Sequence, residues 1–206
     1  MKILAIYGSS RKNRNTDKFL DIFLKKFNYE NEDINKIVLE DLKFSHCISC
    51  YGCARVGKCV LKDDLTDIYS LIEESDIIVF SSPVYFNSVS AISKAFIDRM
   101  QVYWSRKFLL KVDGPKEKFG IALINGGSST EKHQFLGSEL VFDHFFKSTS
   151  CKKNLILEVS ETDKYPINED NKSFMEFLDS IEINKNEKEI YRLKEGKIEK
   201  CKLIEW

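Results

Sequence analysis

The chain has 206 residues, of which 43% are hydrophobic and 12% aromatic, so it can bury a continuous core and is not an intrinsically disordered chain. Its 32 basic and 32 acidic side chains cancel, and the basic excess or stripe typical of nucleic-acid-binding proteins is absent. No apolar run approaches the roughly 20 residues of a membrane-spanning helix, and the apolar N-terminal stretch is too short for a signal peptide. We therefore expect a cytoplasmic protein that binds neither nucleic acid nor membranes.

Five short apolar runs alternate along the chain with amphipathic segments. The runs are residues 2–7, 34–39, 76–81, 119–124 and 155–159. A short run that is apolar throughout is typical of a strand buried on both faces of a parallel sheet. Apolar side chains recur at helical spacing in residues 15–27, 92–103 and 135–146, between these strands.

This alternation predicts an α/β fold with a doubly wound, five-stranded parallel sheet in the strand order 2-1-3-4-5. Ligands bind such a sheet at the carboxyl ends of its strands, so the loops after strands one, three and four should share one site. Residues 174–181 predict a last helix, and the alternation in residues 189–203 predicts a β-hairpin. We expect a single domain over residues 1–206, with a core in 1–160 and the helix and hairpin as an appendage in 161–206.

The turn after the first strand, GSSRKNRNT in residues 8–16, leads into the first helix. A phosphate there would meet unpaired backbone N–H groups and the positive end of the helix dipole, and hydroxyl, amide and guanidinium donors would add to them. The candidate phosphate-binding residues are Ser9, Ser10, Arg11, Asn13, Asn15 and Thr16. The alternative from this segment alone is an ordinary loop in which Asn15 or Thr16 caps the helix.

The same turn resembles the GSPRKxGNT turn of the flavodoxin-like NAD(P)H-dependent FMN reductases, which holds the FMN phosphate. Ser10 stands where many relatives have Pro and Arg14 where many have Gly, and neither difference removes a donor. Residues 82–99, SPVYFNSVSAISKAFIDR, are similar to the (S/T)PVY(F/W)…KxFIDR segment of that family. The resemblance implies a flavodoxin-like fold and FMN as cofactor.

Two further loops at the expected sheet edge suit the flavin ring. A flat apolar ring with polar edges binds against an aromatic wall and exposed backbone amides, and glycines allow close backbone approach. The candidate ring contacts are Pro83, Val84, Tyr85, Phe86, Asn87, Ser88, Asn125, Gly126 and Gly127. The alternative for the two aromatic residues is that they only cover the end of the sheet, and FAD remains an alternative to FMN.

Cys47, Cys50, Cys53 and Cys59 form a C-x2-C-x2-C-x5-C pattern. Clustered thiols in a reducing compartment favour a metal centre over disulfides, and four thiolates at this spacing suit a [4Fe–4S] cluster. Zinc and metal-free thiols are the alternatives. Residues 47–65 also resemble the CxGCxxCxxxGxCxxxDDM stretch of the iron–sulfur flavoproteins, a branch of the same family. Asp63 and Asp64 are expected to begin the next helix, with Asp64 as its N-cap.

The leading hypothesis is an FMN-dependent NAD(P)H oxidoreductase that moves electrons between its flavin and the cluster. The loop after strand two is expected at the same sheet edge as the flavin loops. No catalytic side chain is predicted, because the flavin performs the chemistry. NADH and NADPH are both compatible as reductants, and the acceptor can be a small molecule or a protein.

Two other functions remain open. The first is a cluster-free NAD(P)H reductase of flavins, quinones or azo compounds. The second is a flavodoxin-like electron carrier, which the neutral net charge and the basic first turn disfavour. The segment 92–107 is apolar around more than one face, which predicts a homodimer or homotetramer.

Overall fold

The computed structural model describes residues 1–27, 34–129 and 131–201. The five predicted strands are present as β1 (Ile3–Tyr7), β2 (Ile34–Val38), β3 (Ile77–Tyr85), β5 (Lys118–Asn125) and β6 (Cys151–Val159). They are parallel and lie in the order β2-β1-β3-β5-β6, so the flavodoxin-like arrangement is confirmed for these strands. The side chains of β1 and β5 and most of those of β3 and β6 are buried on both faces of the sheet, whereas the edge strand β2 exposes Asn35 and Lys36.

The predicted strand count of five is wrong, because the sheet of the described chain has eight strands. The additional strands are β4 (Ser88–Val89), β7 (Glu189–Lys194) and β8 (Lys197–Cys201). The predicted C-terminal hairpin is β7 and β8, but β7 pairs in parallel with β6 and extends the sheet instead of standing apart from it. Ile190 and Leu193 of β7 are buried, so joining the sheet removes apolar surface from water.

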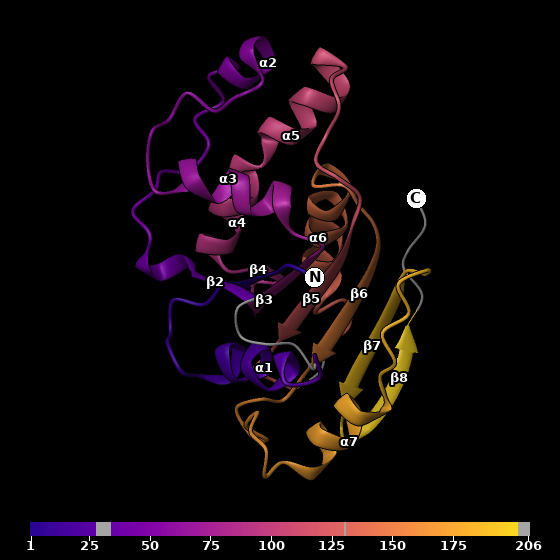
Figure 1. The fold of residues 1–206 in the computed structure, drawn as a ribbon. Helices are drawn as coiled ribbons and strands as arrows, with labels where there is room; N and C mark the ends of the chain where they lie inside the picture. Colours follow the sequence, from indigo (N-terminus) through magenta and orange to yellow (C-terminus); the bar gives the residue numbers. More distant parts are fainter. Residues whose placement is uncertain (28–33, 130, 202–206) are drawn as a thin grey trace.

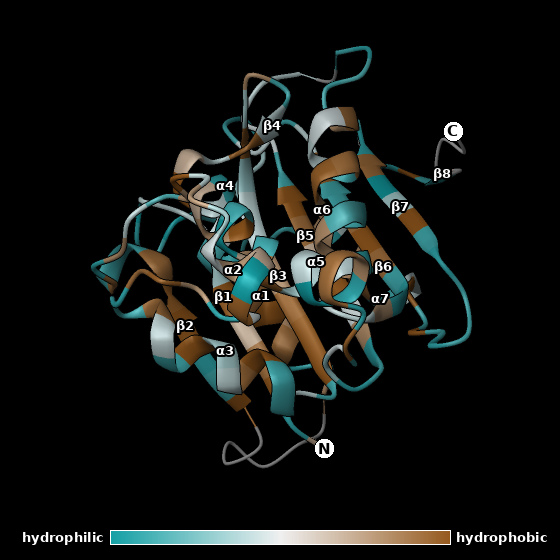
Figure 2. Ribbon diagram, turned by 90° about the horizontal axis from the view of Figure 1, so that it is seen from above, coloured by the Kyte–Doolittle hydropathy of each residue, from teal (hydrophilic) through white to brown (hydrophobic). Residues whose placement is uncertain are grey.

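Helices cover both faces of the sheet (Figure 1). They are α1 (Asn15–Leu24), α2 (Gly52–Val56), α3 (Leu65–Glu74), α4 (Ala91–Arg99), α5 (Gln101–Ser105), α6 (Leu136–Ser148) and α7 (Lys172–Ser180). The apolar side chains of α1 and α7 share one core cluster, and those of α3 to α6 share a second cluster on the other face. In Figure 2, β5 and β6 carry the brown of hydrophobic residues over much of their length.

The predicted helix 92–103 is interrupted. It divides at Met100 into α4 and α5, and α5 continues into a π-helical turn at Arg106–Leu110. Among the described residues, no helix is both long and apolar enough to span a membrane. After the division at Met100, α5 lies beside α2. The helix α2 belongs to the segment that carries the four clustered cysteines.

Candidate functional site

The turn after β1 is held by the backbone of β3 and by two serines of α4. The N–H of Gly8 donates to Ser81 O at 2.8 Å. The hydroxyls of Ser90 and Ser93 both donate to Gly8 O, at 2.6 and 3.0 Å. A Cβ on Gly8 would lie 2.1 Å from Ser93 Oγ and 2.5 Å from Ser81 O, so only glycine allows this approach.

The remainder of the turn divides into buried and exposed residues. Ser9 is buried, and its hydroxyl accepts the N–H of Arg11 at 3.1 Å. Asn13 has a left-handed backbone with φ of 57°, and its N–H donates to Asp17 Oδ2 at 2.7 Å. The side chains of Ser10, Arg11 and Asn13 are exposed, so they can reach a ligand beside the first turn of α1.

Asn15 and Thr16 join this turn to distant loops. The Thr16 hydroxyl donates to Asn125 Oδ1 at 2.8 Å, which ties α1 to the end of β5. Asn15 Nδ2 donates to Thr162 O at 2.9 Å, and Asn15 Oδ1 accepts the N–H of Ile167 at 3.0 Å. The N-cap of α1 is Arg14, without a side-chain cap bond, so neither residue plays the capping role of the alternative interpretation. Their contact with a phosphate stays a prediction.

The hairpin between β3 and β4 presents its aromatic residues to solvent. Phe86 and Asn87 occupy its turn with φ of 49° and 58°, a conformation that few non-glycine residues adopt. The Phe86 ring is fully exposed and Tyr85 is 43% exposed. A Cβ on Gly137 would lie 2.3 Å from Asn87 O, so α6 packs closely against this turn.

The remaining predicted ring contacts lie between this hairpin and the end of β5. Pro83 pairs with Asn125 across the sheet, while Val84 and Tyr85 pair with Val89 and Ser88. Asn125 and Gly126 are buried, and Gly127 is half-buried. The structure therefore brings the three predicted loops to one edge of the sheet.

A fourth loop, which follows β6 and is not among the predicted contacts, also lies at this edge. The N–H groups of Thr162 and Asp163 donate to Gly126 O and Gly127 O at 3.0 and 3.1 Å. The Asp163 carboxylate lies so close to Gly127 that a Cβ there would be 2.5 Å from it. The loop could have been predicted from the sequence because it directly follows a parallel strand, and all such strands end at the same edge of the sheet.

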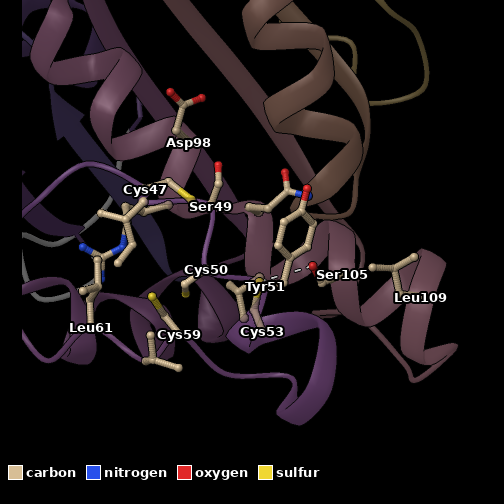
Figure 3. A pocket seen from close by; sticks show the side chains of 15 residues that line it. Cys47, Ser49, Cys50, Tyr51, Cys53, Cys59, Leu61, Asp98, Ser105 and Leu109 are labelled. Atoms are coloured by element: carbon tan, nitrogen blue, oxygen red, sulfur yellow. Dashed lines mark hydrogen bonds between the residues drawn. The ribbon is translucent and has the colours of Figure 1, made fainter.

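The four clustered cysteines all line one cavity of about 430 Å³, together with residues of α4 and α5 (Figure 3). Cys50 is exposed and the other three are partly buried. Cys53 Sγ lies 3.3 Å from Ser105 Oγ. Ser49 and Tyr51 have left-handed backbones, with φ of 52° and 57°, which turn the chain sharply around Cys50.

The donor set of this cavity consists of four thiols. A [4Fe–4S] cluster is held by four thiolates, and a tetrahedral zinc ion also accepts four. Among the described side chains, no three from His, Cys, Asp and Glu form a group that could hold one metal ion. The chemistry of the four thiols fits the cluster that the sequence pattern predicts.

The cysteine segment is closed at its base by an ion pair. The guanidinium of Arg99 donates to Asp63 Oδ2 and Oδ1 at 2.6 and 3.1 Å, and to Ser45 O at 2.8 Å. Asp63 also accepts the N–H of Ser45 and of Leu65, each at 3.2 Å. Partial burial opposes ionisation, but the hydrogen bonds from Arg99 and the backbone outweigh it and lower the pKa of Asp63.

Asp64 is the N-cap residue of α3, as expected. Its side chain, however, makes no cap hydrogen bond and instead accepts the N–H of Lys43 at 2.7 Å. Asp63, one residue earlier, accepts the N–H of Leu65 in the first turn of α3. The Arg99 pairing brings Asp63 to this position, which the local sequence does not reveal.

The cysteine cavity does not share the sheet edge of the other loops, contrary to expectation. The N-cap Ser90 of α4 touches Gly8, whereas Asp98 and Arg99 at its other end line the cavity. The helix has nine residues, so about 13 Å of helix lies between the two sites. In Figure 1, α2 and α5 accordingly lie well above β4.

Three comparisons place the chain among known proteins. The family model of the NADPH-dependent FMN reductases matches residues 1–129. An iron–sulfur flavoprotein of Archaeoglobus fulgidus is 37% identical over 124 residues, covering 60% of this chain and 54% of that protein. An iron–sulfur flavoprotein of Methanosarcina thermophila is 31% identical over 128 residues, covering 62% of this chain and 64% of that protein. The matches thus span between half and two thirds of these relatives.

Solved structures agree on the fold. An azoreductase from Bacillus anthracis superposes with a TM-score of 0.59 at 13% identity, covering 87% of this chain and 94% of that one. An NAD(P)H:quinone oxidoreductase from Methanothermobacter marburgensis gives 0.58 at 13% identity, covering 78% and 87%. These likenesses show the fold, and the family match over more than half of the sequence shows that the chain belongs to the NADPH-dependent FMN reductase family of oxidoreductases.

Proposed function

We propose that this protein is an FMN-dependent NAD(P)H oxidoreductase that exchanges electrons with a [4Fe–4S] cluster held by its four clustered cysteines. One observation carries the proposal: Cys47, Cys50, Cys53 and Cys59 line a single cavity in a chain of the FMN reductase family. The iron–sulfur flavoproteins named above support the same assignment.

The loops at the carboxyl edge of the sheet would hold FMN. The turn after β1 and the N-terminus of α1 offer backbone N–H groups to the phosphate, and the exposed Arg11 adds positive charge. Tyr85 and Phe86 offer an aromatic surface to the ring, and the 125–127 loop offers backbone polar groups to its edge. When bound, FMN supplies a ring that accepts hydride from NADH or NADPH.

The cysteine cavity would hold the cluster, which supplies a one-electron redox centre when bound. Cys50 is exposed, so this site lies at the surface where a small-molecule or protein acceptor can approach. Trp104, Phe108 and Leu109 are exposed apolar side chains nearby, and we assign them to the interface of a homodimer or homotetramer.

A second candidate is a cluster-free NAD(P)H-dependent reductase. It is supported by the 30% identity over 109 residues to a protein of Bacillus subtilis named as a putative NAD(P)H-dependent FMN-containing oxidoreductase. In this case the four cysteines stay as thiols, and the flavin loops keep their role.

The two candidates differ in iron content. The protein is purified anaerobically, and iron, sulfide and flavin are assayed in the wild type, Cys50→Ala and Cys201→Ala. Cys201 is a partly buried cysteine of β8 outside the cavity, so its variant controls for the loss of any one thiol. We expect about four irons per chain in the wild type and in Cys201→Ala, and none in Cys50→Ala, with FMN bound by all three proteins. Flavin and hydride transfer without iron in the wild type would favour the second candidate.

FMN binding is tested separately by fluorescence-quenching titration. Replacing Arg11, which is exposed, with Ala removes a charged donor without disturbing the core, so we expect weaker FMN binding and an unchanged fold. Lys18→Ala is the matched control, because it removes an exposed positive charge from the first turn of α1, outside the predicted contact residues. A wild type without affinity for FMN would contradict the proposal as a whole.

A further inference from the structure

Arg99 is a buried cation at the wall of the cysteine cavity. The residue is 2% exposed, and it lines the cavity together with the four cysteines. Its two terminal nitrogens bind Asp63 and Ser45 O, which stand on either side of the 47–59 segment. Arg99 therefore joins the two ends of the loop that carries the cysteines.

These contacts leave one N–H group of the guanidinium without a hydrogen-bond acceptor among the described residues. Arg99 Nε is buried and has no hydrogen-bond partner among the described residues. A guanidinium carries five N–H donors and is always charged, so a buried N–H without a partner is unusual in a native protein. This N–H is buried, so Arg99 acts on a group bound in the cavity through its charge.

The charge of Arg99 also acts on one particular cysteine. Cys59 and Asp63 both interact favourably with the guanidinium, and the Tyr69 hydroxyl interacts with the Cys59 thiol. The same hydroxyl donates to Arg99 O at 3.2 Å. Asp98, the carboxylate that also lines the cavity, is paired with Lys94 at 2.7 Å. The charge of Arg99 therefore acts on Cys59, and the Asp63 carboxylate paired with Arg99 opposes it.

We propose that Arg99 is a positioning residue that closes the cysteine loop and raises the reduction potential of the iron–sulfur group held in it. The inference rests on the proposed function, because it requires a cluster at the four cysteines. A fixed positive charge in a partly desolvated site stabilises the reduced, more negative form of the group. Asp63 acts in the opposite direction and lowers the potential.

The test uses two substitutions whose effects on the potential have opposite signs. In Arg99→Gln the positive charge is lost, so the midpoint potential falls. In Asp63→Asn the opposing negative charge is lost, so the midpoint potential rises. We expect each change to be about tenfold in the one-electron reduction equilibrium, equivalent to about 59 mV. The measurement is an anaerobic redox titration of the reconstituted full-length protein, followed by electron paramagnetic resonance.

Arg106→Gln is the matched control. Arg106 also contacts the cysteine segment, donating to Gly57 O at 2.7 Å, but its charge is paired with Glu73 at 2.7 Å and it is not among the cavity-lining residues. If the potentials changed only because the 47–59 segment lost structure, Arg106→Gln would change the midpoint potential as well. The opposite shifts expected for Arg99→Gln and Asp63→Asn should not occur in Arg106→Gln. We expect its potential to lie close to that of the wild type.

The outcomes separate this inference from the proposed function. A wild type that binds no iron overturns the proposed function and the inference with it. An iron-loaded wild type whose Arg99→Gln and Asp63→Asn variants shift in the same direction, or no further than Arg106→Gln, overturns only the role of Arg99. If Arg99→Gln does not retain iron, the role of Arg99 is tested with the midpoint potentials of Asp63→Asn and of Arg99→Lys. The second of these variants keeps the positive charge. An upward shift in Asp63→Asn with little change in Arg99→Lys supports the proposal, and no upward shift in Asp63→Asn overturns it.

Discussion

Phe86 combines a left-handed backbone with a fully exposed aromatic ring. The left-handed conformation costs a non-glycine residue about 1 kcal/mol, and an exposed ring gains nothing from the core in return. The close packing of Gly137 against Asn87 O holds the turn in this conformation. An unfavourable backbone that the surrounding structure maintains is typical of a ligand contact.

We expect Phe86→Ala to weaken FMN binding about tenfold, because the aromatic wall is lost, while the free energy of unfolding changes by less than about 0.5 kcal/mol. Fluorescence titration measures the first quantity and urea denaturation the second. Phe108→Ala, at a residue that is 53% exposed and distant from the flavin loops in sequence, is the control. Equal FMN affinity in the two variants would remove Phe86 from the site.

At the scale of elements, α4 links the two candidate sites. Its N-cap Ser90 accepts the N–H of Ser93 at 3.2 Å and also donates to Gly8 O in the phosphate turn. Its last residue, Arg99, closes the cysteine loop. The short helix α4 thus holds Gly8 of the turn after β1 at one end and, through Arg99, the cysteine loop at the other end.

The two roles of Ser90 can be separated with a second N-cap. Asn171 caps α7 by accepting the N–H of Phe174 at 3.2 Å, and α7 lies in the C-terminal part of the chain. We expect Ser90→Ala and Asn171→Ala each to lower the free energy of unfolding by about 1 kcal/mol, measured by urea denaturation. Only Ser90→Ala should also weaken FMN binding, because it removes the shorter of the two hydroxyl hydrogen bonds that hold the Gly8 carbonyl. Equal FMN affinities would show that Ser90 acts only as a cap.

At the scale of the whole molecule, a buried carboxyl group makes stability depend on pH. Glu158 of β6 is fully buried, and Arg192 of β7 donates to it at 2.6 Å. Burial raises the pKa of Glu158 well above its ordinary value, and the neighbouring Glu139 adds to this effect. The folded state therefore retains this proton at pH values where the unfolded chain has lost it.

It follows that the free energy of unfolding falls as the pH rises from the unfolded pKa through the folded pKa of Glu158, by up to about 1.4 kcal/mol per pH unit. Glu158→Gln keeps an acceptor for Arg192 but cannot ionise, so this decline should be absent from the variant. Urea denaturation of both proteins from pH 4 upward measures the difference. A constant difference between the two proteins across that range would contradict the assignment.

Self-association is a second prediction at the scale of the whole molecule. The exposed apolar residues Trp104, Phe108 and Leu109 lie on α5 and the π-helical turn that follows it. We expect light scattering to give a multiple of the 24.0 kDa chain mass, and Phe108→Glu to reduce it by placing a charge in the interface. Lys111→Glu, an exposed residue at the end of the same turn, controls for the added charge. A wild type of 24 kDa would contradict the prediction.

Local patterns in the sequence were sufficient for the strands β1, β2, β3, β5 and β6, their order and the four cysteines that line one cavity. Short runs that are apolar throughout are stable only when both faces are covered, and parallel strands need crossover helices, so alternation along the chain specifies the sheet. The glycine turn was also recognisable, because its position between a strand and a helix specifies a helix N-terminus.

Only the tertiary structure decided which distant segments meet. Thr16 and Asn125 are separated by 109 positions, and Arg99 and Asp63 by 36, so no local pattern connects them. The pairing of β7 with β6 and the position of the cysteine cavity at the far end of α4 likewise depend on how elements pack. The reason is physical: apolar periodicity records which face of an element is buried, whereas the partner against which it is buried is selected by the packing of the complete chain.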